Sequence, residues 1–168
     1  MEWCKGLSPQ LSAPAPLDSS HRLDRFFCGE TALDDWLKRR ALANQASGAS
    51  RTFVVADPQG CVVGYYAMAA GAVSHPGATP SVRRNMPDPV PVMVLARLAV
   101  AVNAQGLQLG GALLQDAVQR AVAVSQQAGV RALLVHALHD RAKLFYEHYG
   151  FQASPLHALT LMLRLSPK

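Results

Sequence analysis

The chain has 168 residues, of which 50% are hydrophobic and 16% are charged. This length fits a single domain with a sizeable core, and the composition excludes an intrinsically disordered protein. No apolar run reaches the roughly 18 residues that a membrane-spanning helix needs. The best candidate, 90–102, is interrupted by Pro91 and Arg97. The first ten residues lack a basic segment followed by an apolar one, so we expect a cytoplasmic protein.

The turn and periodicity signals predict a mixed α/β protein. We expect an extended stretch around Pro14 and Pro16, a helix from Thr31 to about Asn44, strands over 51–56 and 61–73, a proline-rich loop over 75–91, a strand over 91–102, a helix over 110–127, a strand over 130–137, a helix over 140–149 and a strand over 159–165. A turn at 57–60 makes the first two of these strands an antiparallel hairpin. The strands over 91–102 and 130–137 are expected to be parallel, joined by a right-handed crossover.

Two of these helices carry specific expectations about their ends and their buried faces. Thr31 is expected to cap the first helix with its hydroxyl, and Gly48 is expected to end it. Gly129 is expected to cap the helix over 110–127, and Gly150 to stop the helix over 140–149. The faces predicted to pack are Leu33, Trp36, Leu37 and Ala41 in the first helix, and Leu113, Ala117, Ala121 and Val124 in the second.

Cysteine and histidine patterns give no sign of a metal centre. The three cysteines are odd in number and include no Cys-x-x-Cys pair, which argues against a disulfide framework. His136 and His139 are three residues apart, but no further ligand completes zinc spacing. His136 alternates within an apolar strand and is therefore expected to be a core histidine. His139 begins the loop before the helix over 140–149.

The formal net charge of +5 is unevenly distributed. A single basic cluster is usually solvated surface, but several clusters on one small domain favour an anionic partner such as RNA. Arg97 interrupts an apolar strand, and a buried arginine without a partner is costly, so it should contact either an acid or the substrate. The basic residues that we expect to bind an anionic substrate are Lys38, Arg39, Arg40, Arg51, Arg83, Arg84 and Arg97.

A turn-rich segment, 100–111, lies between a buried strand and a helix. Such a junction brings free backbone N–H groups and the positive end of a helix dipole together, which suits a pyrophosphate. Glycines also occur at ordinary strand–helix turns, so this segment alone does not decide the function.

A second motif, Phe145-Tyr146 followed by Gly150-Phe151, makes the interpretation specific. Together the two segments resemble the Q/R-x-x-G-x-G/A and F-Y-x-x-x-G-F signatures of GNAT acetyltransferases. The family's middle glycine falls at Gln108, which places a side chain where backbone usually approaches phosphate. The resemblance covers about residues 20–165. It implies one GNAT domain over 1–168: a single mixed, mostly antiparallel sheet, splayed at a central parallel strand pair and flanked by helices.

The resemblance also implies acetyl-CoA as the acetyl donor and assigns site residues. Tyr146 would protonate the leaving thiolate, although a merely packed aromatic is the alternative. Tyr149 is expected to serve packing, and Phe145 and Phe151 are expected to be core residues. The expected contacts with acetyl-CoA are Leu98, Ala99, Val100, Gln105, Gly106, Leu107, Gln108, Leu109, Gly110, Gly111, His139, Phe145 and Tyr146, of which backbone N–H groups at Leu98 to Val100 would stabilise the oxyanion.

A closer resemblance rests on residues 28–37, 48–55 and 95–100 together with the Tyr146 motif. These segments are similar to the TacT/AtaT-type toxins of type II toxin–antitoxin systems. That resemblance implies acetylation of the α-amino group of aminoacyl-tRNA, which blocks translation, and a ribbon–helix–helix antitoxin as a partner. It leaves a homodimer open, because nothing in the sequence shows the oligomeric state.

The chemistry of the acceptor mildly favours an aminoacyl ester. An α-amino group has a reference pKa of roughly 7.7–8.0 and is partly neutral near pH 7, whereas a lysine at about 10.4 needs a base, and no glutamate is evidently placed as one. Two alternatives remain open. One is a GNAT enzyme that acetylates a small-molecule amine or a protein lysine. The other is a non-catalytic protein that binds acetyl-CoA or nucleic acid and acts with a partner in transcription repression.

Overall fold

The structure is a computed structural model that describes residues 11–166, so the first ten residues, one of the three cysteines (Cys4) among them, lie outside the described part. The chain forms two compact units, which are Met1–Met68 with Arg97–Ala117, and Ala69–Ala96 with Val118–Lys168. The chain therefore passes from one unit to the other within β3 (Val62–Val73), β4 (Val90–Val100) and α4 (Leu109–Ser125). That the whole chain is one domain stays a prediction.

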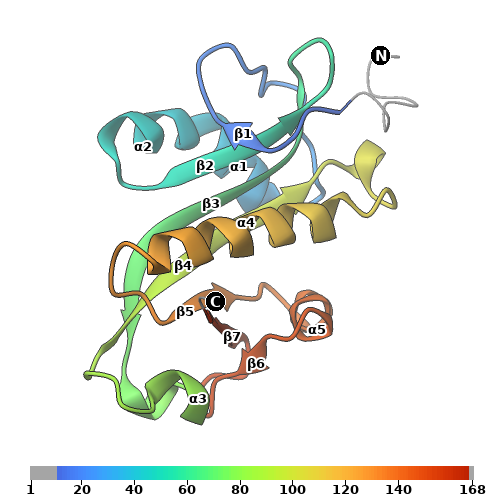
Figure 1. Cartoon of the computed structure of the whole chain (residues 1–168). Coiled ribbons are helices and arrows are strands. Elements are labelled where there is room, and N and C mark those ends of the chain that lie inside the picture. The colour runs from blue at the N-terminus through green and yellow to red at the C-terminus, as the bar shows by residue number, and fades with distance from the viewer. Residues whose placement is uncertain (1–10, 167–168) are drawn as a thin grey trace. The chain divides into compact units, whose positions relative to one another are not determined.

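The first unit is a sheet with helices on both faces. Its elements are β1 (Ala15–Pro16), α1 (Thr31–Arg39), α2 (Ala41–Ser47), β2 (Arg51–Ala56), the first part of β3, the last part of β4, the 3-10 helix η4 (Val102–Ala104) and the first half of α4. The strands follow the order β1-β2-β3-β4 (Figure 1). The predicted hairpin of β2 and β3 is confirmed as antiparallel, with Phe53 opposite Tyr66.

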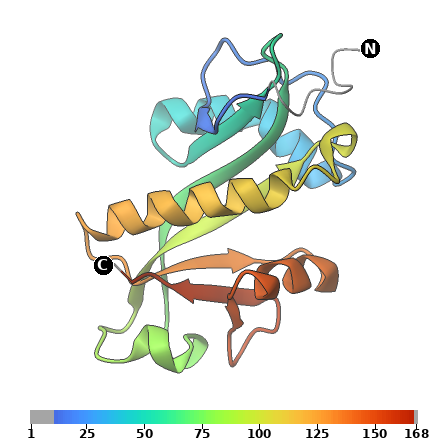
Figure 2. The ribbon, with the colours of Figure 1, turned by 45° about the vertical axis from the view of Figure 1, so that its right-hand side comes forward.

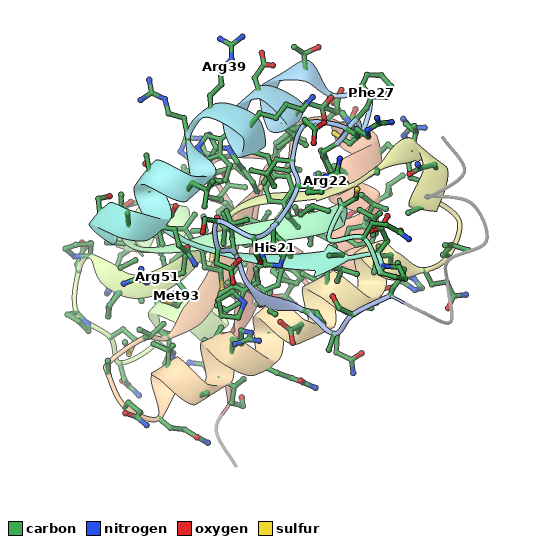
Figure 3. The ribbon with its side chains drawn as sticks, turned by 90° about the horizontal axis from the view of Figure 1, so that it is seen from above. His21, Arg22, Phe27, Arg39, Arg51 and Met93 are labelled. Carbon is green, nitrogen blue, oxygen red and sulfur yellow. The ribbon has the colours of Figure 1, made fainter. Side chains whose placement is uncertain are left out.

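Two consecutive tyrosines of β3 point to opposite faces of this sheet, as the period of a strand requires. Tyr65 packs toward α1, where its hydroxyl donates a 2.8 Å hydrogen bond to the Leu33 carbonyl. Tyr66 points toward α4, where its hydroxyl donates a 2.5 Å hydrogen bond to Oδ2 of Asp116. Figure 3 shows α1 and α2 on one side of these strands and the start of α4 on the other.

The region predicted as one helix from Thr31 to Asn44 is two helices, which corrects the sequence prediction. The chain breaks at Arg40, which has a φ of −121° between α1 and α2. Thr31 does not cap the first helix, because Glu30 is the N-cap residue and makes no side-chain cap hydrogen bond. The Asp34 carboxylate instead accepts a 2.9 Å hydrogen bond from the Cys28 N–H. Gly48 does end α2, with a left-handed φ of 82°.

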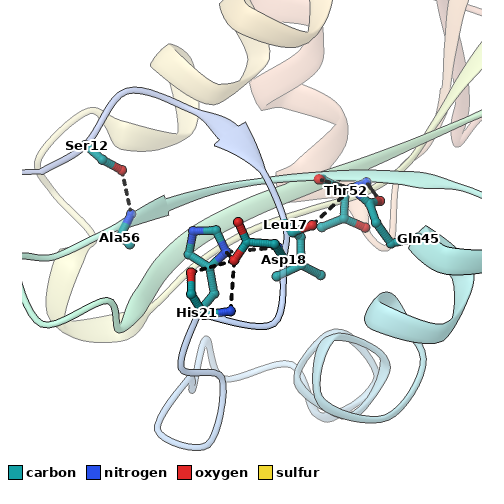
Figure 4. Close-up of polar contacts among 8 residues, drawn as sticks. Ser12, Leu17, Asp18, His21, Gln45, Thr52 and Ala56 are labelled. Carbon is teal, nitrogen blue, oxygen red and sulfur yellow. Dashed lines mark hydrogen bonds and ion pairs between the residues drawn. The ribbon is translucent and has the colours of Figure 1, made fainter.

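One amide side chain ties α2 to its neighbours in the first unit. Gln45 donates to the Leu17 carbonyl at 3.2 Å, and its Oε1 accepts from the Thr52 N–H at 2.8 Å (Figure 4). Further along β2, the Ser12 hydroxyl accepts from the Ala56 N–H at 3.0 Å. The chain before α1 is therefore held to β2, and α2 is held to both.

The second unit contains the parallel strand pair. Its elements are the last part of β3, the 3-10 helix η3 (His75–Gly77), α3 (Pro80–Arg83), the first part of β4, the second half of α4, β5 (Ala132–His136), α5 (Asp140–His148), β6 (Gln152–Ala153) and β7 (Thr160–Arg164). The strands follow the order β3-β4-β5-β7-β6. β4 and β5 are parallel as predicted, with Val92 opposite Ala132, and β7 runs antiparallel beside β5 (Figure 2).

Several local predictions in this unit are wrong. Val124 is 36% exposed, although Leu113, Ala117 and Ala121 are buried as predicted. Gly129 does not cap α4. The helix ends at Ser125 and is followed by turns, and Gly129 is not among the glycines with a positive φ. The loop predicted over 75–91 contains η3 and α3, and β6 was not predicted because two residues are too short to show an alternating pattern.

His136 is exposed rather than a core residue, because it lies at the last position of β5, where the strand leaves the core. Its Nδ1 lies 3.0 Å from the Thr160 hydroxyl. Among residues 11–166, every helix is too short or too polar to span a bilayer.

The hydrogen bond between Tyr66 and Asp116 joins β3 to α4, and Tyr66→Phe removes it. We expect the free energy of unfolding to fall by about 1–3 kcal/mol, because the Asp116 carboxylate loses a charge-assisted donor. Urea denaturation measures the change. Tyr149→Phe is the control, since Tyr149 is 45% exposed and its loss should stay within about 0.5 kcal/mol. Equal stability of the two variants would contradict this role for Tyr66.

Candidate functional site

The turn between β4 and α4 is an exposed loop anchored at its start. The Ala101 N–H donates to the Val63 carbonyl at 2.9 Å, and the Val102 N–H donates to the Phe27 carbonyl at 2.8 Å. After η4, the side chains over 105–108 are exposed, and α4 begins at Leu109. The loop therefore leaves a fixed strand end and enters a helix of 17 residues.

The backbone of this loop presents unpaired donors. The first hydrogen bond of the helix-type pattern runs from the Ala112 N–H to the Gln108 carbonyl at 3.2 Å. Within the described residues, the N–H groups from Gly106 to Gly111 donate to no protein acceptor. A run of unpaired N–H groups at the positive end of a long helix is an arrangement that suits an anion, and the chemistry of these six donors fits phosphate.

The structure explains why a glycine suits the position of Gln108. Gln108 has a φ of 61°, in the left-handed region that L-residues with a Cβ rarely adopt, and Gly106 has a φ of 87°. A glycine at 108 would adopt this backbone without strain. The exposed Gln108 side chain therefore occupies a strained position, while the loop retains the backbone shape that exposes its N–H groups.

Gln105 braces the loop from within. Its Nε2 donates to the Val100 carbonyl at 2.9 Å and to the Cys28 carbonyl at 3.3 Å. The amide therefore links the end of β4 to the segment before α1. The sequence indicated Gln105 as a cofactor contact, and the structure assigns its side chain to supporting the loop.

Arg97 lies on an aromatic ring in the same unit. Its guanidinium carbon is 4.5 Å from the ring centroid of Trp36, and Trp36 stacks on Tyr65 with centroids 6.0 Å apart and 11° between the planes. Among residues 11–166, no carboxylate pairs with Arg97. A cation–π contact satisfies the charge without consuming the N–H donors, so the guanidinium keeps its capacity to bind an anion.

The sequence did not indicate that Trp36 supports Arg97; it predicted only that Trp36 anchors its helix to the sheet. Trp36 does pack against the core of the first unit. No local sequence pattern indicated the contact with Arg97, because the two residues are 61 positions apart in the chain. The only available signal was an arginine in an apolar strand with no acid near it in sequence.

The other basic residues differ in how free they are. Lys38, Arg39 and Arg40 are exposed at the end of α1, and Figure 3 shows Arg39 on the outer side of that helix. Arg51 is also exposed, but its Nη1 donates to the Gln45 carbonyl at 2.8 Å. The first unit thus places two of these cations on α1, one at the break between α1 and α2, and one at the start of β2.

Arg83 and Arg84 belong to the second unit and have different roles. Arg83 turns back onto its own loop, where Nη1 donates to the Ala78 carbonyl at 3.0 Å and to the His75 carbonyl at 3.4 Å. Arg84 is exposed and its side chain has no ion pair among the described residues. The adjacent pair in sequence is therefore one structural and one available arginine.

Tyr146 is buried in the second unit, with 6% of its surface exposed. Its ring contacts Phe145 at 5.1 Å and Phe151 at 5.6 Å between centroids, both nearly edge-on. Burial raises the pKa of Tyr146 to about 12, so the phenol keeps its proton at neutral pH. Gly150, with a φ of 93°, stops α5 as predicted and turns the chain so that Phe151 packs on Tyr146.

Two aromatic residues beside Tyr146 are less buried than the sequence predicted. Tyr149 was predicted to serve packing, but it is 45% exposed and touches the ring edge of Phe145. Phe145 itself is half-buried.

His139 is the N-cap residue of α5, where its Nδ1 accepts a 3.1 Å hydrogen bond from the Ala142 N–H. The sequence indicated His139 as a cofactor contact and missed its capping role, because histidine is not among the usual N-cap residues.

Comparison with known proteins shows what the chain is similar to. Residues 49–153 match the model of an acetyltransferase (GNAT) domain. The chain is 51% identical over 152 residues to a tRNA-acetylating toxin of Mycobacterium tuberculosis (strain ATCC 25618 / H37Rv), covering 90% of this chain and 91% of that protein. It is 26% identical to a probable toxin TacT of Sinorhizobium fredii (strain NBRC 101917 / NGR234), covering 90% of both.

Solved structures give the same picture. AtaT complexed with acetyl-methionyl-tRNAfMet has a TM-score of 0.85 at 25% identity, covering 92% of this chain and 95% of that chain. AtaTR bound with AcCoA has a TM-score of 0.79 at 27% identity, covering 93% and 94%. A mutant of KacT, at 24% identity and a TM-score of 0.85, shows the likeness of fold alone.

The strain at position 108 yields a stability prediction. Gln108→Gly should raise the free energy of unfolding by a few tenths to about 1 kcal/mol, because relief of the left-handed backbone outweighs the larger chain entropy of glycine. Gln108→Ala is the matched control, since it removes the same side chain and keeps a Cβ at the same φ. If urea denaturation gives both variants the same stability, backbone strain at Gln108 is not the cause.

Proposed function

The chain belongs to the GNAT acetyltransferase family, and from this premise we propose that it is a toxin that acetylates the α-amino group of aminoacyl-tRNA and so blocks translation. Its sheet has the parallel β4–β5 pair of that fold, and acetyl-CoA is its acetyl donor. The observation that carries the proposal is the 51% identity to a tRNA-acetylating toxin over 90% of the chain.

The proposed acetyl-CoA contacts begin at the loop between β4 and α4. The N–H groups from Gly106 to Gly111 would bind the pyrophosphate, and they fit it because they lie at a helix N-terminus and have no protein acceptor among the described residues. Leu98, Ala99 and Val100 of β4 would supply backbone N–H groups to the acyl end. The remaining proposed contacts are Gln105, His139, Phe145 and Tyr146.

The proposed acceptor site uses basic side chains that have no acidic partner among the described residues. Lys38 and Arg39 are exposed on α1, Arg40 is exposed directly after it, and Arg97 keeps its donors available on the face of Trp36. Arg51, Arg83 and Arg84 complete the proposed set. A chain with a net charge of +5 attracts a polyanion over distance, so these contacts support a tRNA acceptor over a small cationic amine.

In the proposed reaction the neutral α-amine attacks the thioester carbonyl, a C–N bond forms and the C–S bond breaks. The departing sulfur takes a proton from the Tyr146 hydroxyl. The pKa of about 12 means that the phenol is protonated before the step and that its phenolate is unfavourable. The attack leaves a positive charge on the amine nitrogen, which therefore returns a proton to Tyr146, directly or through water. The general base that a lysine acceptor would require is not needed for this α-amine.

The proposed biological setting follows from the same relatives. A mutant of the AtaT toxin has been solved bound to the C-terminus of the antitoxin AtaR. We extend this to the present chain as a partnership with a ribbon–helix–helix antitoxin, and the oligomeric state includes a homodimer as a candidate. Charged tRNA is found where translation occurs, so the proposed location is the cytoplasm.

Transfer of radiolabelled acetyl groups tests the acceptor. We expect label on charged tRNA and none on uncharged tRNA, polyamines or lysine peptides, because only charged tRNA offers an α-amine on a polyanion. Mild base should release the label as an N-acetyl amino acid, since it cleaves the aminoacyl ester. Label on peptides or polyamines alone would assign the chain to another GNAT reaction, and binding of acetyl-CoA without any transfer would favour the non-catalytic corepressor.

Tyr146→Phe tests the proton donor. We expect kcat to fall by about 10²–10⁴-fold, as for loss of a general acid, while the Kd values for acetyl-CoA and tRNA stay unchanged. The packing of the ring is kept, so thermal unfolding should be close to that of the parent. Tyr149→Phe, which alters an exposed hydroxyl, is the control. Full growth arrest by the Tyr146 variant would rule out this role for the hydroxyl.

A further inference from the structure

Three arginines that are far apart in the sequence meet in the second unit: Arg84, Arg131 and Arg164, called here the arginine triad. Arg131 precedes β5 and Arg164 ends β7, and the pairing of these strands sets Ala132 opposite Arg164. The Leu165 N–H donates to the Arg131 carbonyl at 3.0 Å. The Arg131 side chain reaches the end of α3, where Nη2 donates to the Arg84 carbonyl at 3.2 Å.

Arg131 is held in one orientation by the end of α3. Its Nε donates to the Val82 carbonyl at 3.2 Å, and Nη2 also donates to the Ser81 carbonyl at 3.1 Å. Among the described residues, Nη1 has no acceptor, so two N–H donors of a fixed guanidinium remain available. A side chain that is already ordered loses little rotamer entropy when it binds a ligand.

Within the described residues, no acidic group pairs with the triad. Burial and the neighbouring guanidiniums of Arg164 and Arg84 lower the pKa of Arg131. Arg84 and Arg164 are exposed, and neither forms an ion pair within residues 11–166. Three like charges held together by the fold therefore create a local positive potential that an anion would relieve.

We propose that the arginine triad of the second unit binds the phosphodiester backbone of the tRNA acceptor, in addition to the basic residues proposed for the first unit. This inference rests on the proposed function. A guanidinium pairs with phosphate through two parallel N–H donors, and three arginines suit successive phosphates of a polymer better than a single free ion. The phosphates of acetyl-CoA already have a candidate site in the N–H groups of the first unit.

Charge reversal at Arg164 tests the triad. Arg164→Glu should weaken tRNA binding about tenfold near 0.1 M salt and lower the slope of log K against log salt by about 1. Arg84→Gln/Arg164→Gln should lower that slope by about 1.5, since two phosphate contacts are lost. Filter binding of tRNA over a series of salt concentrations measures both values.

Arg141→Glu is the matched control, because Arg141 is exposed in the same unit, has no ion pair among the described residues and undergoes the same change in charge. It should change tRNA affinity less than twofold. Thermal unfolding of each variant verifies folding, and Arg131 is left intact because its carbonyl contacts support α3. Calorimetry with acetyl-CoA should give the same Kd for all variants.

The outcomes separate the triad from the proposed function. If the parent acetylates charged tRNA but Arg164→Glu and Arg141→Glu bind tRNA equally, the triad is ordinary solvated surface and this inference fails alone. Weaker acetyl-CoA binding with unchanged tRNA binding would also overturn it, because the phosphates involved would be those of the cofactor. A parent that leaves charged tRNA unmodified refutes the proposed function, whatever the variants show.

Discussion

The N–H groups from Gly106 to Gly111, which have no protein acceptor in the described structure, are the constraint on which the first unit depends. A run of unpaired donors is tolerable only where it is exposed or where an anion pairs with it. The structure meets this condition by ending β4 at Val100, bracing the turn with Gln105 and holding α4 to β3 through Tyr66 and Asp116.

The arginines illustrate how one residue type serves two purposes in this chain. Arg83 and Arg131 donate to backbone carbonyls around α3, which holds their guanidiniums in place, and Nη1 of Arg131 keeps two N–H donors without an acceptor among the described residues. Arg97 is stabilised by the ring of Trp36, which leaves its donors available, and Arg84 is exposed. A charge count along the sequence treats these four as equivalent, whereas their contacts show which guanidiniums the fold holds in place and which N–H donors remain available.

The burial of the Tyr146 phenol bears on both the packing of the second unit and the proposed chemistry. Phe145 and Phe151 exclude water from its ring, and this burial raises its pKa to about 12. A tyrosine with an ordinary pKa of about 10 is already protonated at neutral pH, so the packing extends this protonated state to more alkaline pH. In the proposed reaction the hydroxyl is then a donor that must be reprotonated in each turnover, which agrees with an acceptor amine that sheds a proton as it is acetylated.

The sequence by itself determined the elements whose signals are local. The turn at 57–60 specified the β2–β3 hairpin, Gly48 and Gly150 specified two helix ends, and the glycine-rich segment specified the loop before α4. These predictions succeeded because left-handed glycines and turn residues act within a few positions of the chain.

Only the tertiary structure decided which distant groups meet. In the structure, the first predicted helix is interrupted at Arg40, His136 is exposed at the end of its strand, and Arg97 lies on the ring of Trp36. The tertiary structure also brought Arg131 beside Arg164 through the pairing of β5 with β7. Periodicity tells which residues share a face, but what covers that face depends on strand order and on packing between elements, and neither is encoded in local spacing.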